Sequence, residues 1–164
     1  MTVPPPHGLP PLPAPGPRIE CCVSVDHPDW LALRQALWPD TPRHEHLAEM
    51  ASFLASPERF LQLVARTDCG EPAGLAEASV RTDYVNGTAT SPVAFLEGVF
   101  VAPGQRRRGV ASSLLTRVAT WARERGCHEL ASDAPLDNEV SHALHKALGF
   151  RETERVVYFS KALP

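Results

Sequence analysis

A stretch of small and basic residues in the second half of the chain has the composition of an anion-binding loop. Phe95–Leu115 reads FLEGVFVAPGQRRRGVASSLL, an apolar run followed by a Pro-Gly turn, three arginines and a strongly helical segment. The first turn of a helix leaves backbone N–H groups unpaired and carries the positive end of the helix dipole. The small side chains of Gly109 and Ala111 let a ligand approach this backbone closely. The segment indicates a phosphate or pyrophosphate site over Arg107–Ser112, although ordinary helix capping uses the same residue types.

Other nucleotide and nucleic-acid sites are poorly supported. The chain contains neither GxGxxG nor GxxxxGK[ST], so NAD and ATP are weaker interpretations than another pyrophosphate ligand. The net charge is −3, and three of the 16 basic residues are the adjacent Arg106, Arg107 and Arg108. A nucleic-acid-binding protein needs a broad basic face. We therefore expect no nucleic-acid partner.

Glu97 is the clearest candidate for a functional carboxylate. It lies inside the apolar run FLEGVF, where a solvated surface charge is unusual. Ser132 and Asp133 are adjacent, but the glycines of a nucleophile elbow are missing, which argues against a hydrolase.

Two histidine pairs are the only sequence hints of a metal site. His44 and His46 are two residues apart, and His142 and His145 three. Neither pair has companion Cys or acidic ligands at a recognisable spacing. We expect no bound metal.

Hydrophobic spacing and turn residues predict the elements that position these groups. Strands are predicted for Ile19–Val25, Phe60–Arg66, Ala73–Arg81, Val93–Val101, Glu129–Ser132 and Arg155–Lys161. Helices are predicted from the capping residue Asp29 to Trp38, and for Pro42–Ala55, Val110–Arg125 and Asn138–Leu148. The short connections between the middle strands favour antiparallel hairpins over crossovers. The order predicts an α+β domain with a mixed, mostly antiparallel central sheet flanked by helices.

Length and composition predict one domain preceded by a tail. The 164 residues are 43% hydrophobic and 21% charged, enough for one core. Residues 1–18 hold eight of the 17 prolines, so we expect a disordered tail before a domain over 19–164. That tail is either a ligand for a partner or a dispensable extension.

The expected compartment is the cytoplasm. No apolar run approaches the roughly 18 to 20 residues that span a bilayer, and the N-terminal stretch lacks the basic and apolar parts of a signal peptide. We expect no membrane partner. The four cysteines have no framework spacing, which predicts reduced thiols.

The anion loop and several other segments carry a family resemblance. Arg106-x-x-Gly109-x-Ala111 resembles the Q/R-x-x-G-x-G/A pyrophosphate loop of the GNAT N-acetyltransferases, and Asn138 and Leu148-Gly149-Phe150 also match that superfamily. More narrowly, five segments resemble the aminoglycoside 6'-N-acetyltransferases: LRQALWP, DYVNG, SPVAFLEGVFV, ASD and ETERV. They occur in order between Ile19 and Lys161.

This resemblance implies the GNAT (acyl-CoA N-acyltransferase) fold and acetyl-CoA as cosubstrate. The pantetheine arm would pair with the backbone of Val99, Phe100 and Val101, and the Val99 N–H would polarise the thioester carbonyl. The pyrophosphate would lie on Arg107, Arg108, Gly109, Val110, Ala111 and Ser112, with Asn138 as a further cofactor contact.

The resemblance also implies an acceptor site for a polycationic amino sugar. Glu97, Asp133 and Glu154 correspond to substrate-binding acids, and Trp38, Tyr84 and Thr41 to residues beside the sugar. Related enzymes often carry a histidine at the position of Thr41. Glu154 could equally form a surface ion pair with a neighbouring arginine.

The transfer itself needs a proton acceptor and a partner for the departing thiolate. Asp133 is our first candidate for the base and Glu97 the second. His145 stands where the superfamily often has a tyrosine acid, so it is the candidate acid.

Two other functions remain open from the sequence. The enzyme could acetylate another amine, such as a polyamine or a protein N-terminus, or the domain could bind acyl-CoA without catalysis. The apolar Val156–Phe159 (VVYF) would need cover, which with the resemblance predicts a homodimer.

Overall fold

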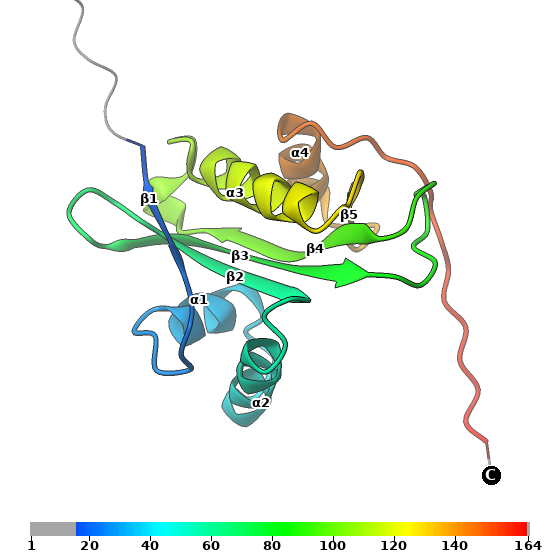
Figure 1. Ribbon diagram of the computed structural model, residues 1–164, viewed down its shortest axis with the longest axis horizontal. Helices are drawn as coiled ribbons and strands as arrows, with labels where there is room; N and C mark the ends of the chain where they lie inside the picture. The colour runs from blue at the N-terminus through cyan, green and yellow to red at the C-terminus, as the bar shows by residue number, and fades with distance from the viewer. Residues whose placement is uncertain (1–15, 164) are drawn as a thin grey trace, which may run out of the picture.

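The computed structural model describes residues 16–163, which form a five-stranded sheet with helices on both faces (Figure 1). The strands are β1 (Arg18–Cys21), β2 (Phe60–Arg66), β3 (Pro72–Arg81), β4 (Val93–Val101) and β5 (Leu130–Ser132), and they lie side by side in chain order. All neighbours are antiparallel except β4 and β5, which are parallel. The predicted α+β fold with a mixed, mostly antiparallel sheet is confirmed. Most of the predicted tail lies outside the described residues, and β1 already begins at Arg18.

Two helices cover each face of the sheet. Helices α1 (Trp30–Leu37) and α2 (Arg43–Leu54) lie on one side, and α3 (Val110–Glu124) and α4 (Glu139–Ala147) on the other (Figure 1). A short 3-10 turn, η1 (Pro103–Gln105), leads from β4 toward α3. The apolar residues of α3 recur at helical spacing and are buried against the sheet.

Strand alternation divides the core into two layers. Leu63 belongs to the cluster that packs under α3, and its neighbour Val64 belongs to the cluster under α1 and α2. The middle strands are therefore buried on both faces, which explains their nearly continuous apolar sequence.

Two expected features near β1 and α1 differ in the structure. The first strand ends at Cys21 and does not continue to Val25, because the chain turns away over Ser24–His27. Asp29 stands at the N-cap of α1, but its side chain forms no cap hydrogen bond and pairs with Arg66 instead.

The prediction of a final strand over Arg155–Lys161 is wrong for the single chain. Residues 150–163 have no regular secondary structure and run outward from the body (Figure 1). A strand needs a neighbour to receive its backbone hydrogen bonds, and no strand within residues 16–163 pairs with this segment. Phe159 is consequently 93% exposed. We call residues 151–163 the C-terminal segment.

Two further features concern the described part as a whole. None of its helices has the length and apolar character needed to cross a membrane. All four cysteines are free, and Cys21 and Cys69 are exposed.

Candidate functional site

The strands β4 and β5 part halfway along β4. Their pairing covers only Ala94–Leu96 on β4, opposite Leu130–Ser132, whereas β4 continues to Val101. Residues Val93–Leu96 are buried, and Glu97–Val101 are only half-buried. The second half of β4 therefore presents a free backbone edge.

The register shows which peptide groups face this free edge. The Ala102 N–H donates to the Ala73 carbonyl at 2.9 Å, on the β3 side. Because peptide groups alternate along a strand, those of Val99 and Val101 face the opposite, open side. At the vertex of the opening, the Ser132 hydroxyl donates to the Leu96 carbonyl at 3.0 Å.

The entrance of α3 lies at the far end of the same strand. Gly109 is the N-cap with φ 78°, and Arg107 also has a left-handed φ of 61°. No side chain caps this helix, so the N–H groups of its first turn are free of intrahelical and side-chain partners. A Cβ added at Gly109 would meet no atom within 4 Å. This open, positively polarised turn fits a pyrophosphate.

A groove of about 400 Å³ lies on the α1 and α2 side of the sheet. It is lined by Arg34, Trp38, Thr41, His46, Glu49, Phe53, Phe60, Glu77 and Glu97. Its lining includes three carboxylates, of which Glu49 and Glu77 pair with Arg34. The structure brings three of the predicted acceptor residues, Trp38, Thr41 and Glu97, into this one groove.

The far end of the Trp38 indole packs against β4 because residue 98 is a glycine. A Cβ on Gly98 would lie 2.6 Å from Cζ2 of the Trp38 indole, closer than carbon atoms can approach. Trp38 follows directly after α1, so the end of that helix and the middle of β4 together fix one wall of the groove.

Glu97, expected from its apolar neighbours to be a functional carboxylate, is paired with polar side chains of β3. Both carboxylate oxygens accept from Arg81 Nη2, at 2.8 and 3.0 Å, and Oε1 also accepts from the Ser79 hydroxyl. Glu97 lies beside a shift in the β3–β4 register, which turns its side chain toward this polar side of β3. A carboxylate has about four lone-pair directions, so Glu97 can still accept from an ammonium group.

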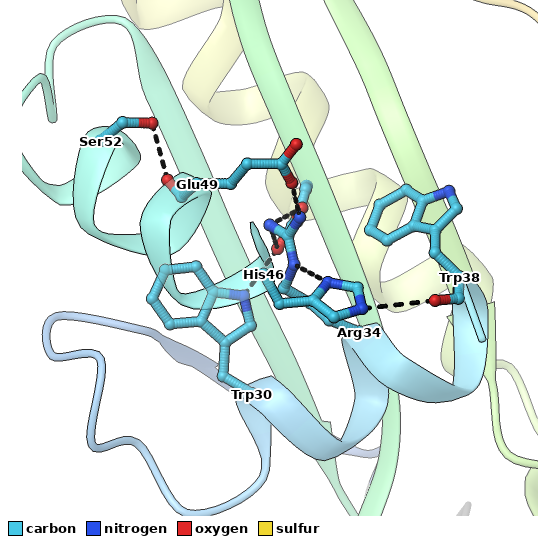
Figure 2. A network of polar contacts seen from close by, with 7 residues as sticks. Trp30, Arg34, Trp38, His46, Glu49 and Ser52 are labelled. Atoms are coloured by element: carbon cyan, nitrogen blue, oxygen red, sulfur yellow. Dashed lines mark hydrogen bonds and ion pairs between the residues drawn. The ribbon is translucent and has the colours of Figure 1, made fainter. Parts of the chain in front are cut away.

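A buried ionic network lies beneath the groove (Figure 2). Arg34 Nη1 donates to both oxygens of Glu77 at 2.9 and 3.0 Å, and Trp30 Nε1 donates to the same carboxylate at 2.6 Å. Arg34 also pairs with Glu49 and contacts His46. Burial raises the pKa of Glu77, while the positive charge of Arg34 and the Trp30 hydrogen bond oppose that shift.

Asp133, Tyr84 and Glu154 do not line this groove. Asp133 is exposed. The last pair between β4 and β5 is Leu96 with Ser132, so Glu97 and Asp133 are the first residues beyond that pair on the two chains. Tyr84 is 77% exposed in the β3–β4 loop. The C-terminal segment that carries Glu154 crosses this loop, where Thr153 packs against Gly87.

His145 and Asn138 lie on α4, near the parting of β4 and β5. His145 Nε2 is 2.9 Å from the Ser132 hydroxyl, and Nδ1 is 2.8 Å from the Ser141 carbonyl. Its ring packs edge-on against Phe150 at 5.2 Å. Asn138 caps the helix, with its side-chain oxygen accepting from the Ser141 N–H at 3.0 Å.

A free strand edge beside a helix entrance agrees with the family match of the sequence. Residues 30–150 match the acetyltransferase (GNAT) family. The chain belongs to this family. GNAT enzymes use acetyl-CoA as cosubstrate, and Val99–Val101 and Arg107–Ser112 are the places where the residues fit it.

Relatives of known function place this acetyltransferase more narrowly. An aminoglycoside N(6')-acetyltransferase type 1 from Acinetobacter baumannii is 58% identical over 135 residues, 81% of this chain and 90% of the relative. One from Serratia marcescens is 49% identical over 144 residues, 86% of this chain and 98% of the relative. The acetyltransferase therefore also belongs to this group.

Solved structures agree with the sequence comparison. The aminoglycoside antibiotic 6'-N-acetyltransferase AAC(6')-Ih from Acinetobacter baumannii superposes with a TM-score of 0.85 at 52% identity, over 91% of this chain and all of that one. AAC(6')-Iy, solved with the bisubstrate analogue CoA-S-monomethyl-acetylneamine, has a TM-score of 0.83 at 42% identity and covers 91% of this chain and all of its own. The GNAT fold expected from the sequence is confirmed.

One histidine of each pair named from the sequence makes polar contacts within the fold. His46 is buried between Arg34 and the Trp38 carbonyl, and a ring nitrogen of His142 contacts the Pro135 carbonyl at 3.0 Å. Within residues 16–163 no group of three His, Cys, Asp or Glu side chains could hold a metal ion.

Sequence reasoning missed Arg34, Glu49 and Glu77. A signal for Glu77 was available, because the strand GLAEASVR places Glu77, Ser79 and Arg81 at alternate positions on one face. A charged face on an otherwise apolar strand indicates a polar site above the sheet. Arg34 and Glu49 carried no such signal, since charged residues are common on helices.

Proposed function

We propose that this enzyme transfers the acetyl group of acetyl-CoA to the 6'-amine of an aminoglycoside antibiotic and thereby gives resistance. The observation that carries the proposal is the groove beside the free edge of β4, where Glu49, Glu77 and Glu97 outnumber the two guanidiniums, Arg34 and Arg81, that pair with them. An acceptor with several ammonium groups complements this excess of negative charge. The names and structures of the relatives support the same acceptor.

The free edge of β4 and the entrance of α3 bind the donor in this proposal. Acetyl-CoA supplies the activated acetyl thioester. The outward peptide groups of Val99 and Val101, with Phe100 between them, pair with the amide-containing arm of the donor, as an added strand would. The Val99 N–H donates to the carbonyl oxygen where negative charge develops.

The helix entrance binds the pyrophosphate. Its contacts come mainly from backbone N–H groups, because Gly109 leaves open space and its neighbours form the first turn. Arg107 and Arg108 add positive charge beside Val110, Ala111 and Ser112. Asn138, which is committed to capping α4 through its oxygen, has its amide N–H groups available for the donor.

The acceptor lies between the groove and the outer loops. Glu97 binds an ammonium group at the floor, and Trp38 and Thr41 contact the sugar from the α1 side. Tyr84 and Glu154 approach from the β3–β4 loop and from the C-terminal segment that crosses it.

Two groups near the vertex handle the protons. Asp133 accepts a proton from the ammonium group, directly or through water, so that the neutral amine can attack; Glu97 is the second candidate. His145 donates to the departing sulfur. Its Nδ1 contacts the Ser141 carbonyl, and its Nε2, 2.9 Å from the Ser132 hydroxyl at the vertex, is the ring nitrogen on the side of the departing sulfur.

The proposal includes a homodimer and a cytoplasmic location. The C-terminal segment is extended, and Val157, Tyr158 and Phe159 are 77%, 82% and 93% exposed, so a second copy would cover an otherwise bare apolar strand. The exposed free thiols of Cys21 and Cys69 suit a reducing compartment.

A thiol-release assay with acetyl-CoA tests the function. Kanamycin and tobramycin, which carry a 6'-amine, should each release CoA, whereas spermidine and a peptide with a free N-terminus should not. Release with spermidine or peptide alone would instead identify another amine as the acceptor. CoA binding without release for any amine would identify a non-catalytic module.

A further inference from the structure

The buried guanidinium of Arg34, which pairs with Glu77, lies beside the Trp38 wall of the groove (Figure 2). We infer that Arg34 and Glu77 are positioning residues, which fix the Trp38 indole and thereby set the affinity for the acceptor. The inference rests on the proposed function, because it takes Trp38 as a wall of the acceptor site.

Arg34 and β4 hold the indole from two sides. The guanidinium carbon of Arg34 is 5.1 Å from the centre of the Trp38 ring, a distance at which a cation attracts the ring face. Atoms Cζ2 and Cη2 at the far end of the indole pack on Gly98. The indole is therefore fixed only while both the guanidinium and the glycine are in place.

Arg34 also holds the backbone of Trp38 through His46. Arg34 Nε lies 3.3 Å from His46 Nδ1, and His46 Nε2 lies 3.3 Å from the Trp38 carbonyl. The neutral imidazole with its hydrogen on Nε2 satisfies both contacts, because Nδ1 then accepts from Arg34 and Nε2 donates to the carbonyl. This chain of contacts links α1 to α2 at the residue that forms the wall.

Neither member of the ion pair is placed to bind the acceptor directly. Arg34 and Glu77 are each 2% exposed. The Arg34 N–H groups are directed to Glu77, His46 and Glu49, while Glu77 accepts from Arg34 and Trp30. We therefore infer that they act on the acceptor through the side chains they hold, Trp38 first among them.

Glu77 also compensates the positive charge of Arg34 beneath the groove. A guanidinium beneath a groove for ammonium groups would repel them if its charge were uncompensated. The contact of Nη1 with both Glu77 oxygens and the pair of Nη2 with Glu49 compensate it. The planar fork of arginine is needed, because one lysine ammonium cannot face Glu77, His46 and the indole together.

Two variants test the inference in the full-length enzyme. Arg34→Lys keeps the charge and removes the fork, and Arg34→Met/Glu77→Gln removes both charges while leaving an acceptor for the Trp30 N–H. In each we expect the kanamycin KM to rise about tenfold, with kcat and the acetyl-CoA KM within about twofold of wild type. Leu114→Ala, in the core under α3, is the control for destabilisation and should leave the kanamycin KM unchanged.

A variant of Trp38 separates positioning from general damage. Trp38→Ala should raise the kanamycin KM by itself. Adding Arg34→Met/Glu77→Gln to it should cause no further rise, because the indole that the ion pair positions is already absent. A second, equal rise in the Trp38→Ala background would overturn the inference, as would a wild-type KM in either folded Arg34 variant.

An NMR measurement without substrates reads the position of Trp38 directly. The indole N–H resonance of Trp38, assigned by its loss in Trp38→Phe, should shift in Arg34→Lys, whereas that of Trp121 on the opposite face should not. An unchanged Trp38 resonance would overturn the inference even in an active enzyme. Absence of acceptor-dependent thiol release in the wild type would instead refute the proposed function and leave this measurement to decide the positioning.

Discussion

Gly109 and Arg107 give the donor site its shape at the scale of single residues. Both have left-handed backbone angles, with φ 78° and 61°, which aim successive N–H groups of the α3 entrance at one point. Gly109 adopts this angle without cost, whereas a residue with a Cβ loses about 1–2 kcal/mol there. No neighbouring atom restricts a side chain at position 109, so the space above it is left for a ligand.

Replacing Gly109 should therefore weaken CoA binding by filling the approach to the N–H groups, in addition to straining the backbone at φ 78°. Gly109→Val should lower CoA affinity at least about tenfold in calorimetry, because its side chain occupies the approach to the N–H groups. Gly109→Asn is the matched control for strain, since asparagine tolerates the left-handed angle but also blocks the approach. Arg107→Ala should lower affinity less. Unchanged CoA affinity in folded Gly109→Val would contradict the account.

Asp133 and Glu97 should differ in their kinetic effects. Asp133→Asn removes the proposed proton acceptor, so kcat for kanamycin should fall about 100-fold and its pH dependence should change between pH 6 and 9. Glu97→Gln removes charge from the groove floor and should raise KM as well as lower kcat. Asp137→Asn, an exposed carboxylate in the loop before α4, is the matched control. A wild-type kcat for Asp133→Asn across that range would exclude the general-base role.

At the scale of elements, Glu129 connects the strand region of β5 to the loop that carries Tyr84. Its carboxylate accepts from the Ala89 and Thr90 N–H groups at 2.9 and 2.7 Å and from the Thr90 hydroxyl. These hydrogen bonds lower the pKa of Glu129, and the bond from the Thr90 hydroxyl has the largest effect. The β3–β4 loop is thereby fastened to the residue that precedes β5.

This contact predicts how the stability of the loop changes with pH. Because the pKa of Glu129 is lower in the folded state, the ionised carboxylate stabilises the fold above its ordinary pKa of about 4.3, and the contribution is lost as pH falls through the lowered value. Glu129→Gln should thus lower the unfolding temperature at neutral pH, and its difference from wild type should shrink as the pH falls through the lowered pKa of Glu129. A difference that grows in acid would show that the carboxylate is not the stabilising form.

The sequence predicted elements well where local pattern and tertiary pairing agree. Phe60–Arg66 and Val93–Val101 have the expected bounds because their β-forming residues are also buried in the sheet. Arg155–Lys161 has an equally strand-like composition and no partner within the described chain, and composition alone cannot supply one. Pairing is decided by other segments, which a local pattern does not contain.

In the candidate site, too, local sequence predicts individual residues better than it predicts their partners. Trp38, Thr41 and Glu97 were expected near the acceptor and line one groove. The ion pair of Arg34 and Glu77 joins residues 43 positions apart, and neither residue alone reveals that its charge is buried and compensated.

At the scale of the whole molecule, the C-terminal segment points to a second copy of the chain. Its exposed apolar residues lie beside Glu154, one of the proposed acceptor residues. A partner that ordered this segment would therefore also order part of the acceptor site. Assembly and acceptor affinity should be coupled.

Light scattering and kinetics together test this coupling. The wild type should be a dimer at micromolar concentration, and Val157→Asp/Phe159→Asp should be a monomer because charge on a covered apolar strand is costly. The monomer should show a raised kanamycin KM and an unchanged CoA affinity. Arg155→Ala, which removes only the exposed pair with Glu152, should remain dimeric. A monomeric wild type would refute the assembly.

The central claim is acetyl transfer to the 6'-amine, and a pair of matched acceptors tests it most directly. Neomycin carries an amine at the 6' position, and paromomycin carries a hydroxyl there on the same framework. With acetyl-CoA and wild-type enzyme, neomycin should release CoA and gain one acetyl group by mass spectrometry, whereas paromomycin should remain unmodified. Equal acetylation of both, or of neither, would contradict the account.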